Sequence, residues 1–262
     1  MEAIAATQRL RIRDSAAGTA APERRFLPRR PDVSVVIPTL NEERNLPGVI
    51  ARLPEWIHEL ILVDACSTDD TVETARRLWP DVRVVEQRRR GKGDALALGF
   101  AAATGDIVVT LDGDGSTDPA EIPRFVAALV AGADMAKGSR FVPGGGSDDL
   151  TRARRMGAHS LTAVFNRVHG TSYTDLCYGY NAFWRDCLGQ IVTARGFEVE
   201  ASMHVSAARA GLEVTEVPSF EHARVHGASH LRTFRDGIRV LAAIVVERPR
   251  RRARPQPEPA RA

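Results

Sequence analysis

Cysteine is scarce in this sequence, and the few that occur are poorly spaced for the structures that cysteines usually build. The 262 residues include three of them, Cys66, Cys177 and Cys187. An odd number without a C-x-x-C pair argues against a disulfide framework and against a zinc site made of thiolates. Such cysteine usage is typical of a reducing compartment, so we expect the protein to be cytoplasmic.

Long apolar runs are also missing. The run "VLAAIVV" at 240–246 falls far short of the roughly 20 residues that a membrane-spanning helix needs. The N-terminal stretch "MEAIAATQRLRIRD" reaches arginine too early to contain the apolar core of a signal peptide. The sequence therefore predicts neither a membrane span nor a signal peptide.

Charge of one sign is not in large excess, since the formal net charge is +3. No global field commits the protein to nucleic acid, and we expect none as a partner. Arginines nevertheless cluster at both ends. Residues 1–31 predict a flexible arm, and residues 248–262 predict a disordered basic tail. The tail either only adds solubility or contacts anionic lipid, which would place the protein peripherally at the inner membrane face.

Between these ends, residues 32–247 are expected to form one domain. The composition of the sequence, 44% hydrophobic and 26% charged, is that of an ordinary globular protein. Its first part alternates strands and helices. Strands are predicted at 33–38, 60–65, 82–87 and 106–111, and helices at 45–53, 67–78, 93–103 and 119–132. This alternation predicts an α/β fold with a mostly parallel sheet covered on both faces. Ligands of such sheets bind beyond the carboxyl ends of the strands.

The second part is less regular and predicts a mixed region on the acceptor side of the same domain. Short strands are expected within 132–141, 180–185 and 212–218, and helices at 154–170, 198–211 and 231–247.

An acidic turn, "LDGDGSTDP" at 111–119, follows the fourth predicted strand. It does not fit a calcium EF-hand, because Thr117 and Pro123 stand where that loop needs glycine and glutamate. "GKGDAL" at 91–96 does not fit a dinucleotide fingerprint, because Leu96 replaces its third glycine. An Asp-x-Asp pair at the edge of a sheet does suit Mg²⁺ or Mn²⁺, which favour carboxylate oxygens and a ligand's phosphates. Asp112 and Asp114 are therefore predicted to hold a divalent cation, against the alternative of a solvated loop.

The ordered set of motifs resembles the family-2 glycosyltransferases of the GT-A fold, and specifically their polyprenyl- (dolichyl-) phosphate sugar synthase branch. The matching segments are "VSVVIPTLNEERNL", "LILVDACSTDDT", "RRRGKGDALALGFAAATGD", "LDGDGSTDP", "KGSRF", "TDLCYGYNAFWR", "GFEVEASM", "EVPSF" and "RVHGASHLR". They cover roughly residues 33–235. Two departures occur: Tyr178-Gly179-Tyr180-Asn181 replaces the usual Ser-Gly-Phe segment, and Ser116 stands where some relatives carry a further metal ligand.

The resemblance implies a GT-A fold, a mixed but mostly parallel sheet with helices on both faces. It also implies an inverting, metal-dependent transfer of sugar from a nucleoside-diphosphate sugar. The preferred acceptor is a polyprenyl phosphate. Two alternatives remain open: the same reaction onto a soluble or glycan hydroxyl, and a nucleotide-sugar-binding protein without catalysis.

Roles for individual residues follow from the same resemblance. The metal would be held by Asp112, Asp114 and Ser116, and the catalytic set would be Asp112, Asp114, Arg140 and Asp175. The donor nucleotide would contact Pro38, Thr39, Asn41, Glu42, Asp64, Lys92, Asp112 and Arg224. A lipid phosphate would be held by Arg140, Arg154 and Arg224, since guanidinium binds phosphate bidentately. If the acceptor is a hydroxyl, the general base would be Asp175 or Glu200. Asp175 could instead orient an arginine or cap a turn, and Glu200 could be structural or contact the sugar.

Two further patterns have competing interpretations. His222, His226 and His230 are spaced four apart, as zinc ligands on a helix would be, but Gly227 interrupts that helix. An aromatic-rich segment either packs in the core or forms a platform for sugar or acceptor. It comprises Tyr173, Tyr178, Tyr180, Phe183 and Trp184.

Overall fold

The computed structural model describes residues 30–89, 91–191, 198–227 and 233–246. The predicted N-terminal arm up to residue 29 and the basic tail from residue 247 lie outside these residues. The seven strands of the main sheet are β1 (Val33–Thr39), β2 (Glu59–Asp64), β3 (Arg83–Glu86), β4 (Ile107–Thr110), β5 (Met135–Ser139), β7 (Asn181–Trp184) and β8 (Val214–Pro218). The helices are α1 (Leu46–Ile50), α2 (Thr71–Leu78), α3 (Lys92–Ala102), α4 (Ile122–Val130), α5 (Arg152–His169), α6 (Val199–Ala210) and α7 (Thr233–Val246).

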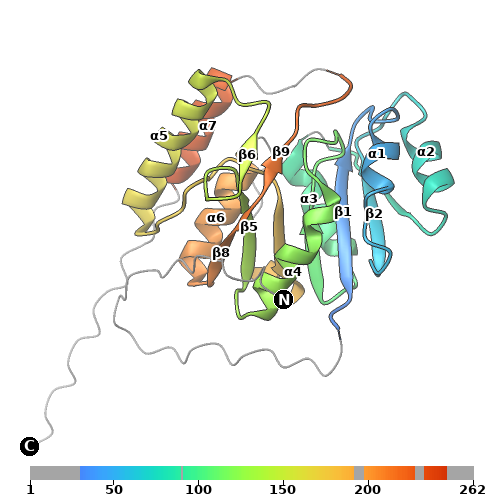
Figure 1. Cartoon of the computed structure of the whole chain (residues 1–262), viewed down its shortest axis with the longest axis horizontal. Coiled ribbons are helices and arrows are strands. Elements are labelled where there is room, and N and C mark those ends of the chain that lie inside the picture. The colour runs from blue at the N-terminus through green and yellow to red at the C-terminus, as the bar shows by residue number, and fades with distance from the viewer. Residues whose placement is uncertain (1–29, 90, 192–197, 228–232, 247–262) are drawn as a thin grey trace, which may run out of the picture.

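The main sheet has the order β3-β2-β1-β4-β7-β5-β8. β7 runs antiparallel to both of its neighbours, and the other pairs are parallel. The predicted mixed, mostly parallel sheet is thereby confirmed. β1 and β2 are apolar and buried along almost their whole length, because helices cover the sheet on both faces. In the view of Figure 1, α4 packs in front of the sheet and α3 behind it.

Most predicted elements match within one to three residues. The predicted helix at 45–53 is shorter than expected, since α1 ends at Ile50 in a turn ahead of Pro54. α5 begins at Arg152, earlier than predicted, because the Thr151 side chain accepts a hydrogen bond from the Arg154 N–H and so caps the helix. A second small sheet of β6 (Gly146–Ser147) and β9 (Phe220–Glu221) was not predicted, because two-residue strands leave no periodic signal.

The two ends of the sheet carry different helices. α5 and α7 stand side by side at one end of the molecule, and α1 and α2 lie at the other (Figure 1). Among the described residues, no helix combines the length and the apolar character that crossing a bilayer requires. The carboxyl ends of β1, β2 and β4 meet at one edge, where the acidic turn begins.

Candidate active site

The acidic turn is placed by β4 and shaped by two glycines. Gly113 packs so closely on β1 that a Cβ would lie 3.0 Å from the Thr39 methyl carbon. Gly115 has φ of +80°, a conformation that L side chains rarely adopt. The turn therefore folds back on itself, and Asp112 and Asp114 line the same cavity.

Asp112 is held by a lysine that joins two elements. Lys92, the first residue of α3, places its Nζ 2.5 Å from Asp112 Oδ1 and 2.8 Å from Glu200 Oε1 on α6. Burial alone would lower the pKa of Lys92, but these two carboxylates raise it above its ordinary value, so the amino group stays charged. Burial raises the pKa of Asp112; Lys92 opposes this shift and the charge of Asp114 adds to it.

Asp114 is held by an arginine from the far end of the chain. Arg224 Nη2 lies 2.6 Å from Asp114 Oδ2, and its Nη1 lies 3.5 Å from Glu42 Oε1. The segment that carries Arg224 crosses the turn, because the His222 N–H donates to the Ser116 carbonyl oxygen at 2.8 Å. Burial raises the pKa of Glu42, against the opposing influence of Asn45 and Arg224.

The acidic turn fits a hard divalent cation. Four carboxylates, Asp112, Asp114, Glu200 and Glu42, share the two cations Lys92 and Arg224. Mg²⁺ commonly takes one or two carboxylates and completes its shell with water and phosphate oxygens, which is what this arrangement offers.

The alternative of a metal held by histidines receives no support. Among the residues with described positions, no group of three or more His, Cys, Asp or Glu side chains is arranged to hold a metal by itself. His222 instead packs its ring on Phe220. His230, the third member of the predicted spacing, lies outside the described residues.

Polar side chains follow β1 and β2 at the same edge of the sheet. Asp64 ends β2 opposite Thr39 of β1, and its carboxylate accepts the Ser67 N–H at 2.9 Å. Asn41, at φ of +56°, accepts the Thr68 N–H at 2.8 Å on its side-chain oxygen. These contacts fix the loops after both strands, but only Pro38 and Glu42 of this region reach the cavity wall. Thr39, Asn41 and Asp64 form a neighbouring polar cluster, in which Thr39 and Asp64 are buried.

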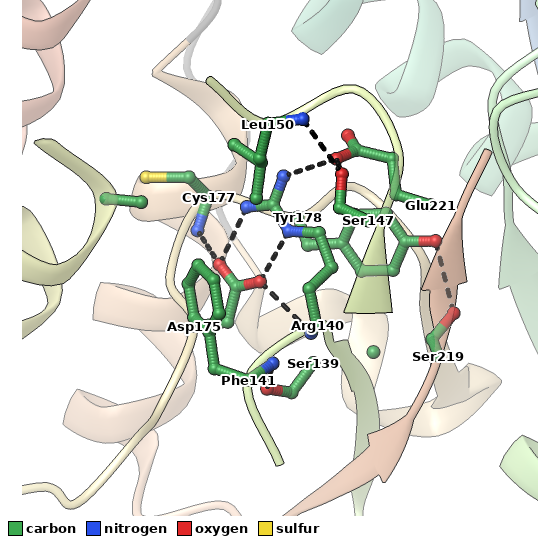
Figure 2. Close-up of polar contacts among 12 residues, drawn as sticks. Ser139, Arg140, Phe141, Ser147, Leu150, Asp175, Cys177, Tyr178, Ser219 and Glu221 are labelled. Carbon is green, nitrogen blue, oxygen red and sulfur yellow. Dashed lines mark hydrogen bonds and ion pairs between the residues drawn. The ribbon is translucent and has the colours of Figure 1, made fainter. Parts of the chain in front are cut away.

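A second cationic group, Arg140, lies farther along the cavity and is clamped by carboxylates (Figure 2). Arg140 Nε and Nη2 lie 2.7 and 3.0 Å from the two carboxylate oxygens of Asp175, and Nη1 lies 3.0 Å from Glu221 Oε2. Burial would lower the pKa of Arg140, but Asp175 and Glu221 raise it, so it remains a cation. A guanidinium has five N–H donors, and three are engaged here by described residues. The other two N–H donors have no hydrogen-bond partner among the described residues.

The cavity connects both cationic groups. It has a volume of about 1100 Å³ and runs from Pro38 and the acidic turn past Arg140 and Arg154. Arg154 pairs with Asp149 at 2.7 Å. Beyond them, the wall becomes largely apolar between α5 and α7. This part of the lining includes Leu150, Ala153, Gly157, Ala158, Leu161, Ile238, Val240 and Leu241.

The contacts of Asp175 favour the orienting role over the base role, both of which the sequence left open. Its side chain is fully buried behind Arg140 and does not line the cavity. Burial alone would raise the pKa of Asp175, but the charge and hydrogen bonds of Arg140 outweigh this and lower it. A buried, ion-paired carboxylate of lowered pKa is a poor proton acceptor, so the geometry favours the orientation of Arg140 over direct base catalysis.

The aromatic segment packs mainly in the core. All five rings are buried, and Tyr180 stacks on Phe125 with centroids 4.2 Å apart. Only Tyr178 also reaches the cavity, with its ring 5.0 Å from the Arg140 guanidinium carbon. The packing interpretation therefore holds for four of them, and a ligand contact is open to Tyr178 alone.

Several residues of this site were not predicted from the sequence. Glu221, Asp149 and Gly179 line the cavity. Glu221 and Asp149 pair with the predicted Arg140 and Arg154, and a Cβ on Gly179 would lie 2.8 Å from Lys92 Nζ. Glu221 could have been suspected, since it follows a predicted strand in the motif "EVPSFE". Asp149 and the apolar wall carry no local signal, because only the packing of α5 beside α7 brings them together.

With this geometry established, similarity to known proteins identifies the class. The sequence profile described as "Glycosyl transferase family 2" matches residues 34–192. The chain belongs to glycosyl transferase family 2. It is therefore a glycosyltransferase, as its motifs predicted.

Relatives of this family 2 glycosyltransferase include polyprenyl-phosphate enzymes. The undecaprenyl-phosphate mannosyltransferase of Micrococcus luteus is 32% identical over 71% of this chain and 82% of its own length. The polyprenol monophosphomannose synthase of Mycolicibacterium smegmatis is 32% identical over 75% of this chain and 80% of its own. The predicted resemblance to this branch is confirmed.

A solved structure supports the fold. The glucosyl-3-phosphoglycerate synthase of Mycobacterium tuberculosis, in complex with Mn²⁺, UDP-glucose and phosphoglyceric acid, has a TM-score of 0.67 and is 28% identical. The match covers 83% of this chain and 79% of that chain. The α/β GT-A fold expected from the motifs is thereby confirmed.

Proposed function

We propose that this glycosyltransferase transfers a sugar, with inversion and with Mg²⁺ or Mn²⁺, from a nucleoside-diphosphate sugar to a polyprenyl phosphate. The observation that carries the proposal is the single cavity that joins the acidic turn to Arg140 and Arg154 and then continues along an apolar wall. The donor diphosphate would lie at the acidic turn, the acceptor phosphate at the two arginines, and the isoprenoid chain along the apolar wall. The names of the Micrococcus and Mycolicibacterium relatives support the same acceptor.

On the donor side, Asp112 and Asp114 would hold the cation, with the Ser116 hydroxyl close to a water of its shell. When bound, the cation would supply Lewis-acid stabilisation of the negative charge of the leaving diphosphate. Lys92 and Arg224 would contact phosphate oxygens; in support of this, each lies within 3 Å of one of the two aspartates. The loops at Pro38, Thr39, Asn41, Glu42 and Asp64 would receive the nucleoside.

On the acceptor side, Arg140 and Arg154 would bind the phosphate and direct one oxygen at the anomeric carbon. Attack from the face opposite the leaving diphosphate inverts that carbon. A phosphate monoester has a second pKa of about 6, so near neutral pH its oxygen needs no general base.

The charges of the cavity favour an ionised acceptor over a hydroxyl. Each carboxylate among the described residues that line the cavity is ion-paired with a lysine or arginine. These residues are Glu42, Asp112, Asp114, Asp149, Glu200 and Glu221. A sugar hydroxyl would need one of them as a free base, whereas a lipid phosphate needs only cations.

The decisive experiment partitions the product. Purified protein is incubated with Mn²⁺, a labelled nucleotide sugar and either a short polyprenyl phosphate or a soluble hydroxyl acceptor, followed by butanol extraction. We expect the label in the organic phase only with the lipid phosphate. Label that stays in the aqueous phase, attached to the hydroxyl acceptor, would contradict the proposed acceptor. Donor binding without turnover on either acceptor would support a non-catalytic binding protein.

We further propose that the end of the molecule formed by α5 and α7 contacts an anionic membrane. α7 exposes apolar side chains at Ile238, Leu241 and Val245, with Ile238 57% exposed. This spacing puts them on one side of the helix. On α5, the exposed Met156 lies beside the exposed arginines Arg152 and Arg155, so an apolar surface is flanked by cations, as binding to acidic headgroups requires.

Vesicle sedimentation tests this contact. The full chain should sediment with phosphatidylglycerol vesicles but not with phosphatidylcholine vesicles, and Ile238→Ser/Leu241→Ser should bind the former at least several-fold more weakly. Val130→Ser is the matched control, because Val130 is 60% exposed on α4, away from this end. Equal binding by both serine variants would contradict the contact, and a concentration-dependent dimer that the double variant abolishes would assign the surface to a second copy.

A further inference from the structure

Lys137 is a fully buried lysine in the middle of β5. Its neighbours across the sheet are Asn181 on β7 and Glu216 on β8. Its Nζ lies 3.3 Å from Glu216 Oε1 and also donates to the backbone carbonyl oxygen of Asp175. A buried charge is unfavourable unless it is paired and hydrogen-bonded, and both conditions are met here.

Glu216 binds the same short segment from the other side. Its carboxylate accepts hydrogen bonds from the Thr174 N–H at 3.0 Å, the Thr174 hydroxyl at 2.9 Å and the Asp175 N–H at 3.2 Å. Lys137 therefore holds the Asp175 carbonyl and Glu216 holds the Asp175 N–H. The two buried charges fix the backbone of Asp175 at both ends of the residue.

From Asp175 the contacts lead directly to Arg140. Both carboxylate oxygens of Asp175 bind the Arg140 guanidinium, and the Arg140 N–H also donates to Asp175 at 3.3 Å (Figure 2). Ser139, one residue before Arg140, shares a hydrogen bond of 2.6 Å with the Thr174 hydroxyl. Every step from Lys137 to the guanidinium is thus a direct contact between described residues.

Among the described residues that pack on the sheet side of Asp175, Lys137 is the only cation. The Tyr173 ring lies 5.6 Å from Lys137 Nζ. His204 is fully buried beside Tyr173, and burial together with the charge of Lys137 holds the pKa of His204 well below its ordinary value. His204 is therefore neutral, so the fixed positive charge belongs to Lys137.

We propose that Lys137 and Glu216 are positioning residues for the acceptor: they fix Asp175 and, through it, the two Arg140 donors that face the acceptor phosphate. The inference rests on the proposed function for the identity of that acceptor. Neither residue lines the cavity, so any effect on acceptor binding must be indirect, through the Asp175 segment and the Arg140 guanidinium that Asp175 holds. Donor binding depends on Lys92, Asp112, Asp114 and Arg224, which contact neither Lys137 nor Glu216.

The test uses the neutral double variant Lys137→Met/Glu216→Gln, because each single variant leaves an unpaired buried charge and can fail to fold. We expect its KM for polyprenyl phosphate to rise at least tenfold while its KM for the nucleotide sugar stays within twofold. In an Arg140→Ala background, the same two substitutions should change the acceptor KM by less than twofold, because the contact they act through is gone. An unchanged acceptor KM, or an equal rise in both KM values, would overturn the proposal.

A second measurement does not depend on sugar transfer. The Cys177 N–H donates to Asp175 Oδ1 at 3.1 Å, and Cys177 lines the cavity. Burial and the charge of Asp175 raise the pKa of its thiol to about 12, so alkylation is slow in the native protein. In a Cys66→Ser background, the neutral double variant should be alkylated by iodoacetamide at Cys177 at least tenfold faster.

The control for this measurement is Leu60→Ala, a buried change in β2 that lowers stability away from the Asp175 segment. It should leave the alkylation rate of Cys177 within about twofold. If the wild-type protein forms no lipid-linked sugar, the proposed function fails, but the alkylation rates still decide the positioning role. Equal rates in the wild-type protein and the double variant would refute it.

Discussion

Asp175→Asn separates the two roles that a carboxylate at this position can have. The wild-type carboxylate is fully buried and binds Arg140 through both oxygens. Asparagine has a side chain of the same shape, but its NH₂ group would face the Arg140 guanidinium, and both of these groups are hydrogen-bond donors. The substitution therefore removes one partner of a buried ion pair while Glu221 still contacts the other side of Arg140.

The expected loss of stability is substantial. Breaking a buried ion pair costs about 3–5 kcal/mol, and we take the lower figure of about 3 kcal/mol because Glu221 remains. For a domain of this size, about 3 kcal/mol corresponds to a fall in Tm of roughly 6–12 °C. Asp149→Asn is the matched control, since the Asp149–Arg154 pair is partly exposed and such pairs contribute about 0–1 kcal/mol.

The pH dependence has a definite sign. The folded-state pKa of Asp175 is lowered, so its ionisation contributes stability above the unfolded-state pKa of about 3.9, and this contribution is lost as the pH falls through the folded-state pKa. The Tm gap between wild type and Asp175→Asn should be constant from about pH 7 down to about pH 5 and should narrow in more acid solution. Thermal unfolding followed by circular dichroism measures this gap.

Kinetics complete the comparison. If Asp175 orients Arg140, the variant should lose affinity for the acceptor and keep the pH–rate profile of the wild type. If Asp175 were a general base, kcat would fall by about 10²–10⁴-fold and the acidic limb of the profile would disappear. A Tm within about 1 °C of wild type would refute the reasoning about the buried pair, because that reasoning predicts a shift several times larger.

Three further predictions concern close contacts and the metal. Gly99→Ala places a Cβ 2.2 Å from Val36 Cγ1 and should lower the free energy of unfolding, measured by urea denaturation, by about 1–3 kcal/mol. Adding Val36→Ala should restore part of the lost stability. If it restores none, a steric clash between the two residues is not the cause. Gly179→Ala places a Cβ 2.8 Å from Lys92 Nζ, so we expect a nearly unchanged Tm but at least a tenfold loss of kcat/KM for the donor. Asp114→Ala should lower kcat by about 10²-fold or more and abolish the Mn²⁺-dependent rise in Tm that the nucleotide sugar gives the wild type; a full rise in the variant would contradict the metal assignment.

The sequence predicts most of this fold because its strands and helices have strong local signals. The continuous β-branched run of β1 and the glycine that ends α6, Gly211 in the left-handed conformation, are readable without a structure. The acidic turn was also predictable, since the Asp-x-Asp spacing and the strand before it place the carboxylates at the sheet edge. These features depend on neighbours in the sequence.

What could not be predicted depends on contacts across long stretches of chain. The resemblance placed Arg224 in the donor site, but it did not predict its ion pair with Asp114, which lies 110 residues away. Glu221, 81 residues from Arg140, was not predicted to pair with it. The role of Asp175 was ambiguous for the same reason, because its burial behind Arg140 follows from the packing of β5 against β7 and β8. The sequence shows the sign of each charge directly. Whether a charged side chain faces solvent, a ligand or another side chain depends on the tertiary structure.

The two halves of the cavity differ in how their cations are held, and this difference has a functional consequence. Lys92 and Arg224 each bind one aspartate of the acidic turn. In the proposed function, a metal would occupy these carboxylates, and the two cations would then exchange the aspartates for donor phosphate. Arg140 is held from behind by the buried Asp175, which no ligand reaches. Under the proposed function, the ion pairs of the donor side would therefore rearrange on binding, whereas those of the acceptor side would stay fixed. Donor and metal should bind first under this arrangement, and product-inhibition kinetics should show the nucleoside diphosphate as a competitive inhibitor of the nucleotide sugar but not of the lipid phosphate.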